Sequence, residues 1–152
     1  MGLKGTLQSD LTEAIRSRDE LKSGTIRMVL TSITNEEVSG KIARTLTEPE
    51  IITVLSREAK KRREAAQAFA DGGRPDRAER EKLEGEFITG YLPAQLSAEE
   101  IKAMITLAIA QSGAAGPAGM GVVMKIISPE IAGKADGGLV STLVKAALMG
   151  GN

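Results

Sequence analysis

The chain has 152 residues, of which 41% are apolar and 26% are charged, so a packed globular protein is expected. Lysine plus arginine and aspartate plus glutamate number 20 each, which leaves no overall field to attract nucleic acid. The absence of cysteine and histidine excludes disulfides, thiolate nucleophiles, and Ser–His–Asp or Cys–His machinery within this chain.

Targeting and membrane signals are not visible in the sequence. Residues 1–10 lack the apolar core of a signal peptide, and no apolar run approaches the roughly 18 residues of a membrane span. We therefore expect a cytoplasmic protein without a membrane partner.

The first two predicted helices each carry one apolar stripe. The first stripe recurs every four residues and consists of Leu3, Leu7, Leu11 and Ile15. The second follows the Ser23-Gly24 region and consists of Ile26, Val29, Leu30 and Ile33.

A capping box opens the third predicted helix, because Thr47 is followed by Glu50 with Pro49 in the first turn. The apolar face of this helix consists of Ile51, Leu55, Ala59, Ala66 and Phe69, and Gly72-Gly73 ends it. A highly charged fourth helix is predicted over residues 76–88, with Leu83 and Phe87 as its apolar anchors.

Three shorter helices are predicted after Pro93. The first opens at a capping box of Ser97 and Glu100, buries one side, and closes at Gly113; the buried residues are Ile101, Met104, Ile105 and Ile109. The second contains Val122, Val123 and Ile126, and Ser128-Pro129 is expected to interrupt it. The third begins after Asp136 as N-cap and is expected to bury Leu139, Val140, Leu143, Val144 and Ala147. No segment alternates with the period of a strand, so the predicted class is all-α.

A change in composition near residues 91–97 predicts two domains. Sixteen basic and 16 acidic residues precede this segment, and four of each follow it. We predict an N-terminal domain of about four helices over residues 1–93 and a small helical tail domain over residues 97–152, each near the lower size for independent folding.

The densest basic cluster lies in the third helix. Arg57, Lys60 and Lys61 share a helix face with Glu64, and such a strip can contact phosphates. The alternative is a solvated face whose charges are balanced by Glu58 and Glu64.

Arg62 falls on the apolar stripe of the same helix, where an unpaired charge would be costly. We predict that it is partly buried and paired with a carboxylate, with Glu58 and Glu37 as the candidates. The carboxylates of Asn35-Glu36-Glu37 and Arg57-Glu58 lie inside predicted helices, and no histidine supports them. This favours structural ion pairs over catalysis or metal binding. No catalytic residue, metal site or cofactor is predicted.

The segment Gly133-Lys134-Ala135-Asp136-Gly137 precedes a helix N-terminus, where backbone amides and Lys134 can bind an anion. Asp136 would compete for the same helix end as N-cap, and the glycines can serve turn geometry alone. The P-loop spacing is absent.

Five segments together resemble the GatB/YqeY family, in the order expected for its free-standing members. They are residues 26–37, 56–62, 91–97, 120–124 and 133–137, and the resemblance covers nearly the whole chain. The last two segments resemble the tail domain of the B subunit of glutamine-dependent tRNA amidotransferases.

The resemblance implies an accessory protein associated with tRNA, with an amidotransferase or with another translation-related protein. The family label is a carbon–nitrogen ligase with glutamine as amido donor, but the isolated chain lacks the catalytic domains and is not expected to be catalytic by itself. The implied tail contacts are the turn at Met120-Gly121, Lys125, and the Gly133-Lys134 segment.

Three possible functions remain open from the sequence. With three aromatic residues, the chain would grip the backbone of a structured RNA such as tRNA and not stack on single-stranded bases. A protein-interaction module that docks on a larger enzyme without RNA contact would instead expose an apolar patch. Weak catalysis together with a partner would require a cleft with a perturbed Glu or Lys. The sequence is compatible with a monomer.

Overall fold

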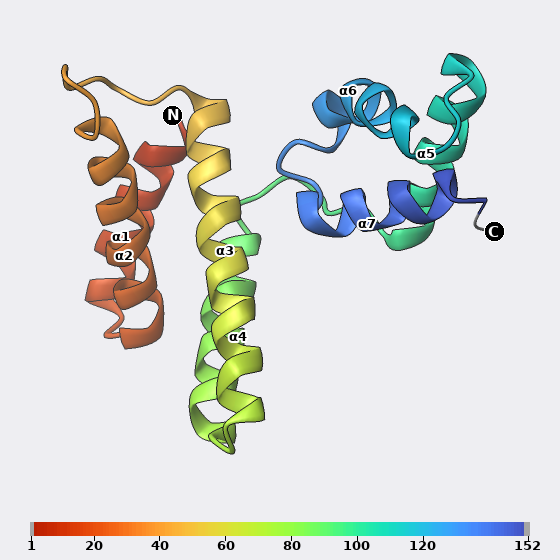
Figure 1. The fold of residues 1–152 in the computed structure, drawn as a ribbon. Coiled ribbons are helices and arrows are strands. Elements are labelled where there is room, and N and C mark those ends of the chain that lie inside the picture. The colour runs from red at the N-terminus through yellow and green to blue at the C-terminus, as the bar shows by residue number, and fades with distance from the viewer. Residues whose placement is uncertain (1, 151–152) are drawn as a thin grey trace. The chain divides into compact units, whose positions relative to one another are not determined.

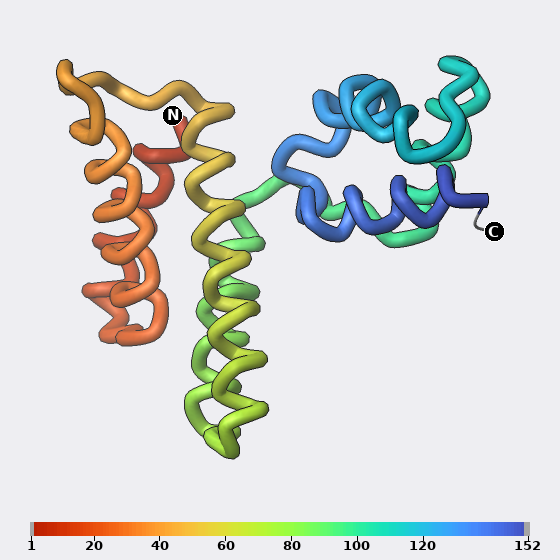
Figure 2. The backbone as a smooth tube through the Cα atoms, in the orientation of Figure 1, coloured from red at the N-terminus to blue at the C-terminus, as the bar shows by residue number. Residues whose placement is uncertain are grey.

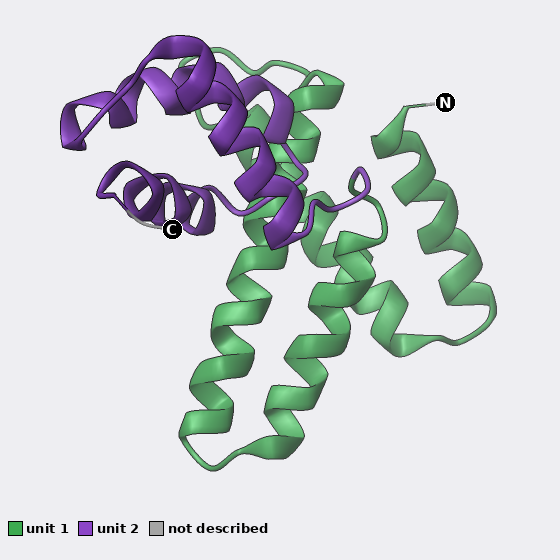
Figure 3. Ribbon diagram, turned by 90° about the vertical axis from the view of Figure 1, so that its right-hand side faces the viewer, with its two compact units in different colours: residues 1–92 green, residues 93–152 purple. Residues whose placement is uncertain are grey.

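The computed structural model describes residues 2–150, and in that range it contains seven α-helices, one short 3-10 helix and no strand (Figure 1). The all-α prediction is therefore confirmed. The chain divides into two compact units, an N-terminal unit of residues 1–92 and a tail unit of residues 93–152 (Figure 3). Whether each unit folds independently stays a prediction.

Two helical hairpins form the N-terminal unit. The first pairs α1 (Leu3–Arg16) with α2 (Glu20–Glu37), and the second pairs α3 (Glu48–Asp71) with α4 (Pro75–Thr89) (Figure 2). The predicted capping box of α3 is present: the Thr47 hydroxyl accepts from the Glu50 N–H, and the Glu50 carboxylate accepts from the Thr47 N–H at 2.8 Å.

The core of the N-terminal unit is built from all four helices and one loop residue, namely Leu7, Ile26, Val29, Ile33, Leu46, Ile51, Val54, Leu55, Ala59 and Ile88. Two expected core positions were wrong. Ile15 is 49% exposed and Ala14 is buried instead, because the 3.6-residue period turns the fourth position of the leucine stripe out of the interface. Leu83 is 42% exposed, since α4 packs through Gly85 and Ile88.

The second hairpin continues past this core. On α3 no residue after Ala59 is buried, although the helix runs on to Asp71. Residues 60–84 are called the hairpin arm below, and the distal turns of α3 and α4 at its tip extend beyond the ends of α1 and α2 (Figure 1). The arm therefore consists of two helices that rely mainly on each other.

Three α-helices form the tail unit: α5 (Ala98–Ser112), α6 (Met120–Ile131) and α7 (Gly137–Leu148), with the 3-10 helix η1 (Pro117–Gly119) before α6. Gly113 ends α5 in the left-handed conformation (φ 69°), as its position after the helix predicts. The core residues are Ile101, Ile105, Ala108, Val123, Ile127, Ile131, Val140, Val144 and Leu148.

Several details of the tail unit differ from the prediction. Pro129 does not end the helix as expected: it lies inside α6, which continues to Ile131, although it has no N–H to donate to the carbonyl of residue 125. Leu139 was predicted to be buried but is 46% exposed, and on α6 Val122 and Ile126 are 48% and 37% exposed while Val123 is buried. These helices are apolar on more than one face, and their packing partners decide which face is buried.

No single helix within residues 2–150 has the length and apolar character needed to cross a membrane. The segments Ala98–Ser112 and Pro117–Ile131 have the required length and apolar character only as a pair, and the two are bent by 99° to each other.

Candidate functional site

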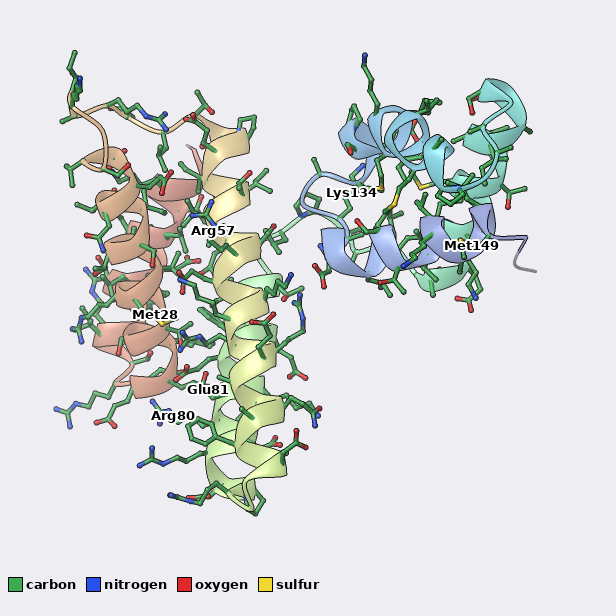
Figure 4. All side chains as sticks on the ribbon, viewed as in Figure 1. Met28, Arg57, Arg80, Glu81, Lys134 and Met149 are labelled. Carbon is green, nitrogen blue, oxygen red and sulfur yellow. The ribbon has the colours of Figure 1, made fainter. Side chains whose placement is uncertain are left out.

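The predicted basic strip lies on the exposed side of α3, and two of its cations pair with acids of the same unit. The Nη1 atom of Arg57 lies 3.6 Å from the Oε2 atom of Glu36, and the Nζ atom of Lys61 lies 3.2 Å from the Oε1 atom of Glu58 (Figure 4). Lys60 is half-buried on the same helix. This pairing favours the charge-balanced alternative for the strip.

Glu58 is 5% exposed and joins α3 to α2. Its Oε1 atom accepts a hydrogen bond from the Ser32 hydroxyl at 3.1 Å as well as from Lys61. A buried carboxylate requires such donors, so the role of Glu58 is to connect these two helices.

Glu37 organises the end of α2 and the loop that follows. Its carboxylate accepts from the Lys4 Nζ at 2.8 Å and from the Leu46 N–H at 3.1 Å, and its carbonyl accepts from the Arg44 N–H at 2.9 Å. The hydrogen bond from Lys4, followed by that from the Leu46 amide, holds the pKa of Glu37 below its usual value.

Arg62 is partly buried and paired with carboxylates, as predicted, but both candidate partners were wrong. Its Nη1 atom lies 3.3 Å from Glu81 and 3.8 Å from Glu84, both on α4, and its side chain is 22% exposed. The phase of α3 turns Arg62 towards α4, while Glu58 and Glu37 are occupied by the partners described above.

Gly85 permits this arrangement. A β-carbon at Gly85 would lie 3.1 Å from the Cβ atom of Arg62, which is a tight contact. The glycine thus lets α4 approach α3 beside the ion pair.

Sequence reasoning missed a tether between the two ends of the N-terminal unit. The Tyr91 hydroxyl donates to the Oδ2 atom of Asp10 at 2.6 Å across a separation of 81 residues, and the Tyr91 ring packs edge-on against Phe87. Burial, followed by the hydrogen bond to Asp10, raises the pKa of Tyr91. No local spacing in the sequence could have revealed a pair so far apart.

In the tail unit, the loop between α6 and α7 is used for structure and leaves one cation exposed. The Leu96 N–H donates to the Lys134 carbonyl at 2.9 Å, and the Gln95 amide donates to the Gly133 carbonyl at 2.8 Å. The Lys134 side chain itself is exposed (Figure 4). The backbone of this loop therefore anchors residues 95–96, which belong with the tail.

Asp136 is the N-cap of α7, as predicted, and its carboxylate accepts from the Gly138 N–H at 3.1 Å. A carboxylate already occupies the positive end of this helix, so an anion at the same end would face repulsion. This geometry favours the folding role over an anion site at the helix N-terminus.

The lysines of the tail unit differ from the cations of α3. Four are exposed, and within residues 93–150 none of them makes an ion pair: Lys102, Lys125, Lys134 and Lys145. The ion pairs described above join residues of the N-terminal unit to one another. Within residues 93–150, the charges of these four lysines are thus not neutralised by an ion pair.

Among residues 2–150, no three His, Cys, Asp or Glu side chains are grouped to hold a metal ion. Besides Glu37, the pKa of Glu50 is lowered, first by the Thr47 N–H and then by Arg44, and both are structural partners. These shifts belong to helix caps and loop anchors.

The comparisons with known proteins agree with the resemblance drawn from the sequence. The family model described as Yqey-like protein matches residues 4–148. Two similar proteins are both called "Altered inheritance of mitochondria protein 41, mitochondrial". The protein from Candida glabrata is 34% identical over 105 residues, and that from Clavispora lusitaniae is 35% identical over 106.

The matches cover 67% and 68% of this chain but 57% and 61% of the two relatives. A relative of the same description from Eremothecium gossypii is 33% identical over 99 residues, which cover 64% of this chain and 54% of that protein. The chain therefore spans about three fifths of the length of the relatives it matches. The family match over nearly the whole chain shows that this protein belongs to the Yqey-like family.

Proposed function

We propose that this chain is an accessory protein that associates with tRNA, with the tail unit contacting the phosphate backbone. The observation that carries the proposal is that the exposed lysines of the tail unit have no acidic partner within residues 93–150, Lys125 and Lys134 among them. A free ammonium group is available to a phosphate without first breaking an ion pair. Arg57 and Lys61 on α3 are less available, because each of them already pairs with a glutamate.

The proposal makes the chain a binding protein and not a carbon–nitrogen ligase. Amide hydrolysis needs an activated nucleophile. This chain has no cysteine, and it has no histidine that could act as the base for a serine. In this proposal an amidotransferase or another translation-related enzyme performs the chemistry, and residues 1–93 serve as the helical companion of the tail.

The cellular location belongs to the proposal as well. The relatives that match are mitochondrial by name, whereas the sequence of this chain led us to expect the cytoplasm. Mitochondria and cytoplasm both contain tRNA, so the proposed RNA contact does not depend on which of the two compartments holds the protein.

The test is fluorescence anisotropy of labelled tRNA across a salt series with the full chain. Lys125→Ala/Lys134→Ala should weaken binding and lower the salt slope by about one unit per lost phosphate contact. Lys102→Ala/Lys145→Ala is the matched control, because it removes the same charge from the same unit. Lys60→Ala/Lys61→Ala tests the α3 strip.

Binding at micromolar or tighter affinity, weakened only by Lys125→Ala/Lys134→Ala, would support the proposal and locate the RNA-binding surface. Equal losses of affinity in the Lys125/Lys134 and Lys102/Lys145 variants would show that binding depends on the net charge of the tail unit and not on a particular surface. No binding above the nonspecific level would reject the RNA contact for this chain.

A second function, docking on a protein without RNA contact, is favoured by a different observation. The tail unit exposes five large apolar side chains, namely Leu107, Val122, Ile126, Leu139 and Met149. Apolar surface of this kind is typical of protein interfaces. Val122→Ser/Ile126→Ser should leave tRNA binding unchanged under the first function, and should abolish binding to the partner enzyme under the second.

A further inference from the structure

Three hydrogen bonds fix the backbone around Lys134 in the loop between α6 and α7. The Lys134 N–H donates to the Ile131 carbonyl at 2.8 Å, which ties the loop to the end of α6. The Gly133 carbonyl accepts from the Gln95 side-chain amide at 2.8 Å, and the Lys134 carbonyl accepts from the Leu96 N–H at 2.9 Å. These two carbonyls belong to the planar peptide groups on either side of the Lys134 Cα atom. Their hydrogen bonds therefore fix the direction in which the Lys134 side chain leaves the backbone.

Both of these donors come from residues 93–96, called the linker segment below, which directly follow the N-terminal unit. The Gln95 amide nitrogen also donates to the Pro93 carbonyl at 2.7 Å, so its two N–H groups join the start of the linker segment to the loop. Leu96 packs against the core of the tail unit, and Leu92, just before the segment, packs against the core of the N-terminal unit. The hydrogen bonds from Gln95 and Leu96 to the loop are called the linker clamp below.

The linker clamp holds Lys134 without using its charge. Residues 93–96 contain no ionisable side chain. The Lys134 side chain is exposed, and within residues 93–150 it makes no ion pair. Its ammonium group is thus available to an anion while the backbone that carries it is already ordered. Pre-organisation of this kind favours binding because less conformational freedom is lost when the ligand arrives.

We propose that the linker segment regulates the RNA contact of the tail unit by holding Lys134 in position. While the linker clamp is closed, Lys134 reaches a phosphate from a fixed backbone. When the linker segment leaves the loop, both peptide groups beside Lys134 are free to rotate, and phosphate binding weakens because the loop must be ordered again. Gln95 is the positioning residue and touches no phosphate itself. This inference rests on the tRNA contact proposed above.

The coupling acts in both directions. If closing the linker clamp strengthens the phosphate contact by some factor, a bound phosphate stabilises the closed clamp by the same factor. The linker segment follows Leu92, the last residue of the N-terminal unit. RNA bound to the tail should therefore reduce the mobility of the chain at this junction, which hydrogen exchange of the Leu96 amide measures.

The linker clamp can be tested without RNA by hydrogen exchange on the full chain. Gln95→Met keeps the length of the side chain, removes both hydrogen bonds donated by its amide and leaves the charge unaltered. Exchange of the Leu96 and Lys134 amides should become at least about threefold faster, as expected for the loss of a net hydrogen bond. Gln111→Met is the matched control, because Gln111 is exposed at the end of α5 in the same unit, away in sequence from the linker segment and the loop. Circular dichroism confirms that both variants keep their helices.

The effect on RNA is measured by fluorescence anisotropy of labelled tRNA across a salt series. Gln95→Met should weaken binding at least about threefold and leave the salt slope unchanged, because it removes no positive charge. Added to Lys134→Ala, the same substitution should have no further effect, whereas added to Lys125→Ala it should keep its full effect. A merely structural role of Gln95 would weaken binding equally in both backgrounds.

The two experiments separate the clamp from the RNA contact. Unchanged exchange of the Leu96 and Lys134 amides in Gln95→Met would overturn the linker clamp, whatever the RNA result. Faster exchange with unaltered tRNA affinity, or equal weakening in the Lys134→Ala and Lys125→Ala backgrounds, would overturn the regulation of RNA binding. If the unaltered chain binds no tRNA, the proposed function fails and the regulation fails with it, while the exchange experiment still decides whether the clamp exists.

Discussion

The Nη1 atom of Arg62 lies 3.3 Å from the Oε2 atom of Glu81, and this ion pair joins α3 to α4 where the apolar core of the N-terminal unit has already ended. The two side chains are 22% and 19% exposed. Neither the Arg62 Nε atom nor the Glu81 Oε2 atom has a hydrogen-bond partner among residues 2–150, so the contact is mainly electrostatic. Charge therefore contributes to holding together an arm that has few apolar contacts.

Removal of Arg62 should destabilise the N-terminal unit. Arg62→Met would leave the carboxylates of Glu81 and Glu84 facing each other without their shared cation, at an expected cost of about 1–2 kcal/mol. Urea unfolding followed by circular dichroism measures the change. Arg63→Met on the same helix is exposed and unpaired, and should stay within about 0.5 kcal/mol of the unaltered protein. Equal effects of the two substitutions would contradict a specific role for Arg62.

The tether between Tyr91 and Asp10 should contribute to stability through its hydrogen bond. Tyr91→Phe removes the hydroxyl that donates at 2.6 Å and should cost about 1 kcal/mol while the ring stays packed on Phe87. A double-mutant cycle with Asp10→Asn measures the coupling of the pair. Additive effects of the two single substitutions would show that the hydrogen bond contributes little.

Tyr91 is the only tyrosine of a chain without tryptophan, so its ionisation can be followed alone. Burial raises the pKa of Tyr91, with a smaller contribution from the hydrogen bond to Asp10, and the phenolate absorbance should therefore develop above the ordinary value of about 10. The unfolded chain loses this proton first. Stability from this group is thus complete below about pH 10 and falls as the pH rises further. Titration with an onset at about pH 10 in the folded protein would contradict the burial of the hydroxyl.

Glu37 should make the loop between α2 and α3 sensitive to acid. The hydrogen bond from Lys4 lowers the pKa of Glu37 below its ordinary value of 4.5, so its contribution is present above that pH and is lost as the pH falls through the lower folded value. We expect the thermal midpoint of Glu37→Gln to lie below that of the unaltered protein at pH 7. The gap should narrow as the pH falls below 4.5 and Glu37 takes up its proton, because both side chains are then neutral; a constant gap would rule out ionisation as the cause.

The boundary of the tail can be tested with two fragments. Residues 93–152 keep the hydrogen bonds from Gln95 and Leu96 to the loop at residues 133–134, and residues 97–152 lack them. The longer fragment should be more stable by about 1–3 kcal/mol in urea unfolding. A chain of about 60 residues is marginal in size, so the difference should decide whether a cooperative transition is seen at all. Equal stability of the two fragments would support a tail domain that begins at residue 97.

Helix ends were the features best predicted from the sequence. The capping boxes at Thr47 and Ser97, the left-handed Gly113 and the N-cap Asp136 are all present. Each is a local device, in which a side chain or a glycine satisfies backbone groups within a few residues of itself. The Yqey-like family assignment was confirmed as well, because its segments are also local.

The partners of individual side chains were predicted less well. Arg62 was placed correctly in a partly buried position but given the wrong acids, and the partner of Tyr91 was not foreseen. In both cases the partner lies on another helix. On α6, the choice between Val122 and Val123 as the buried residue was also decided by neighbouring helices.

The amino-acid sequence by itself determined the helical class, the capped ends of α3, α5 and α7, and the family, because these follow from periodicity, caps and short segments of the chain. Only the tertiary structure decided which face of each apolar helix is buried, which carboxylates hold Arg62, and which lysines lack a partner. These depend on contacts between residues far apart in sequence, and a one-dimensional pattern does not specify the rotation and depth at which one helix packs against another.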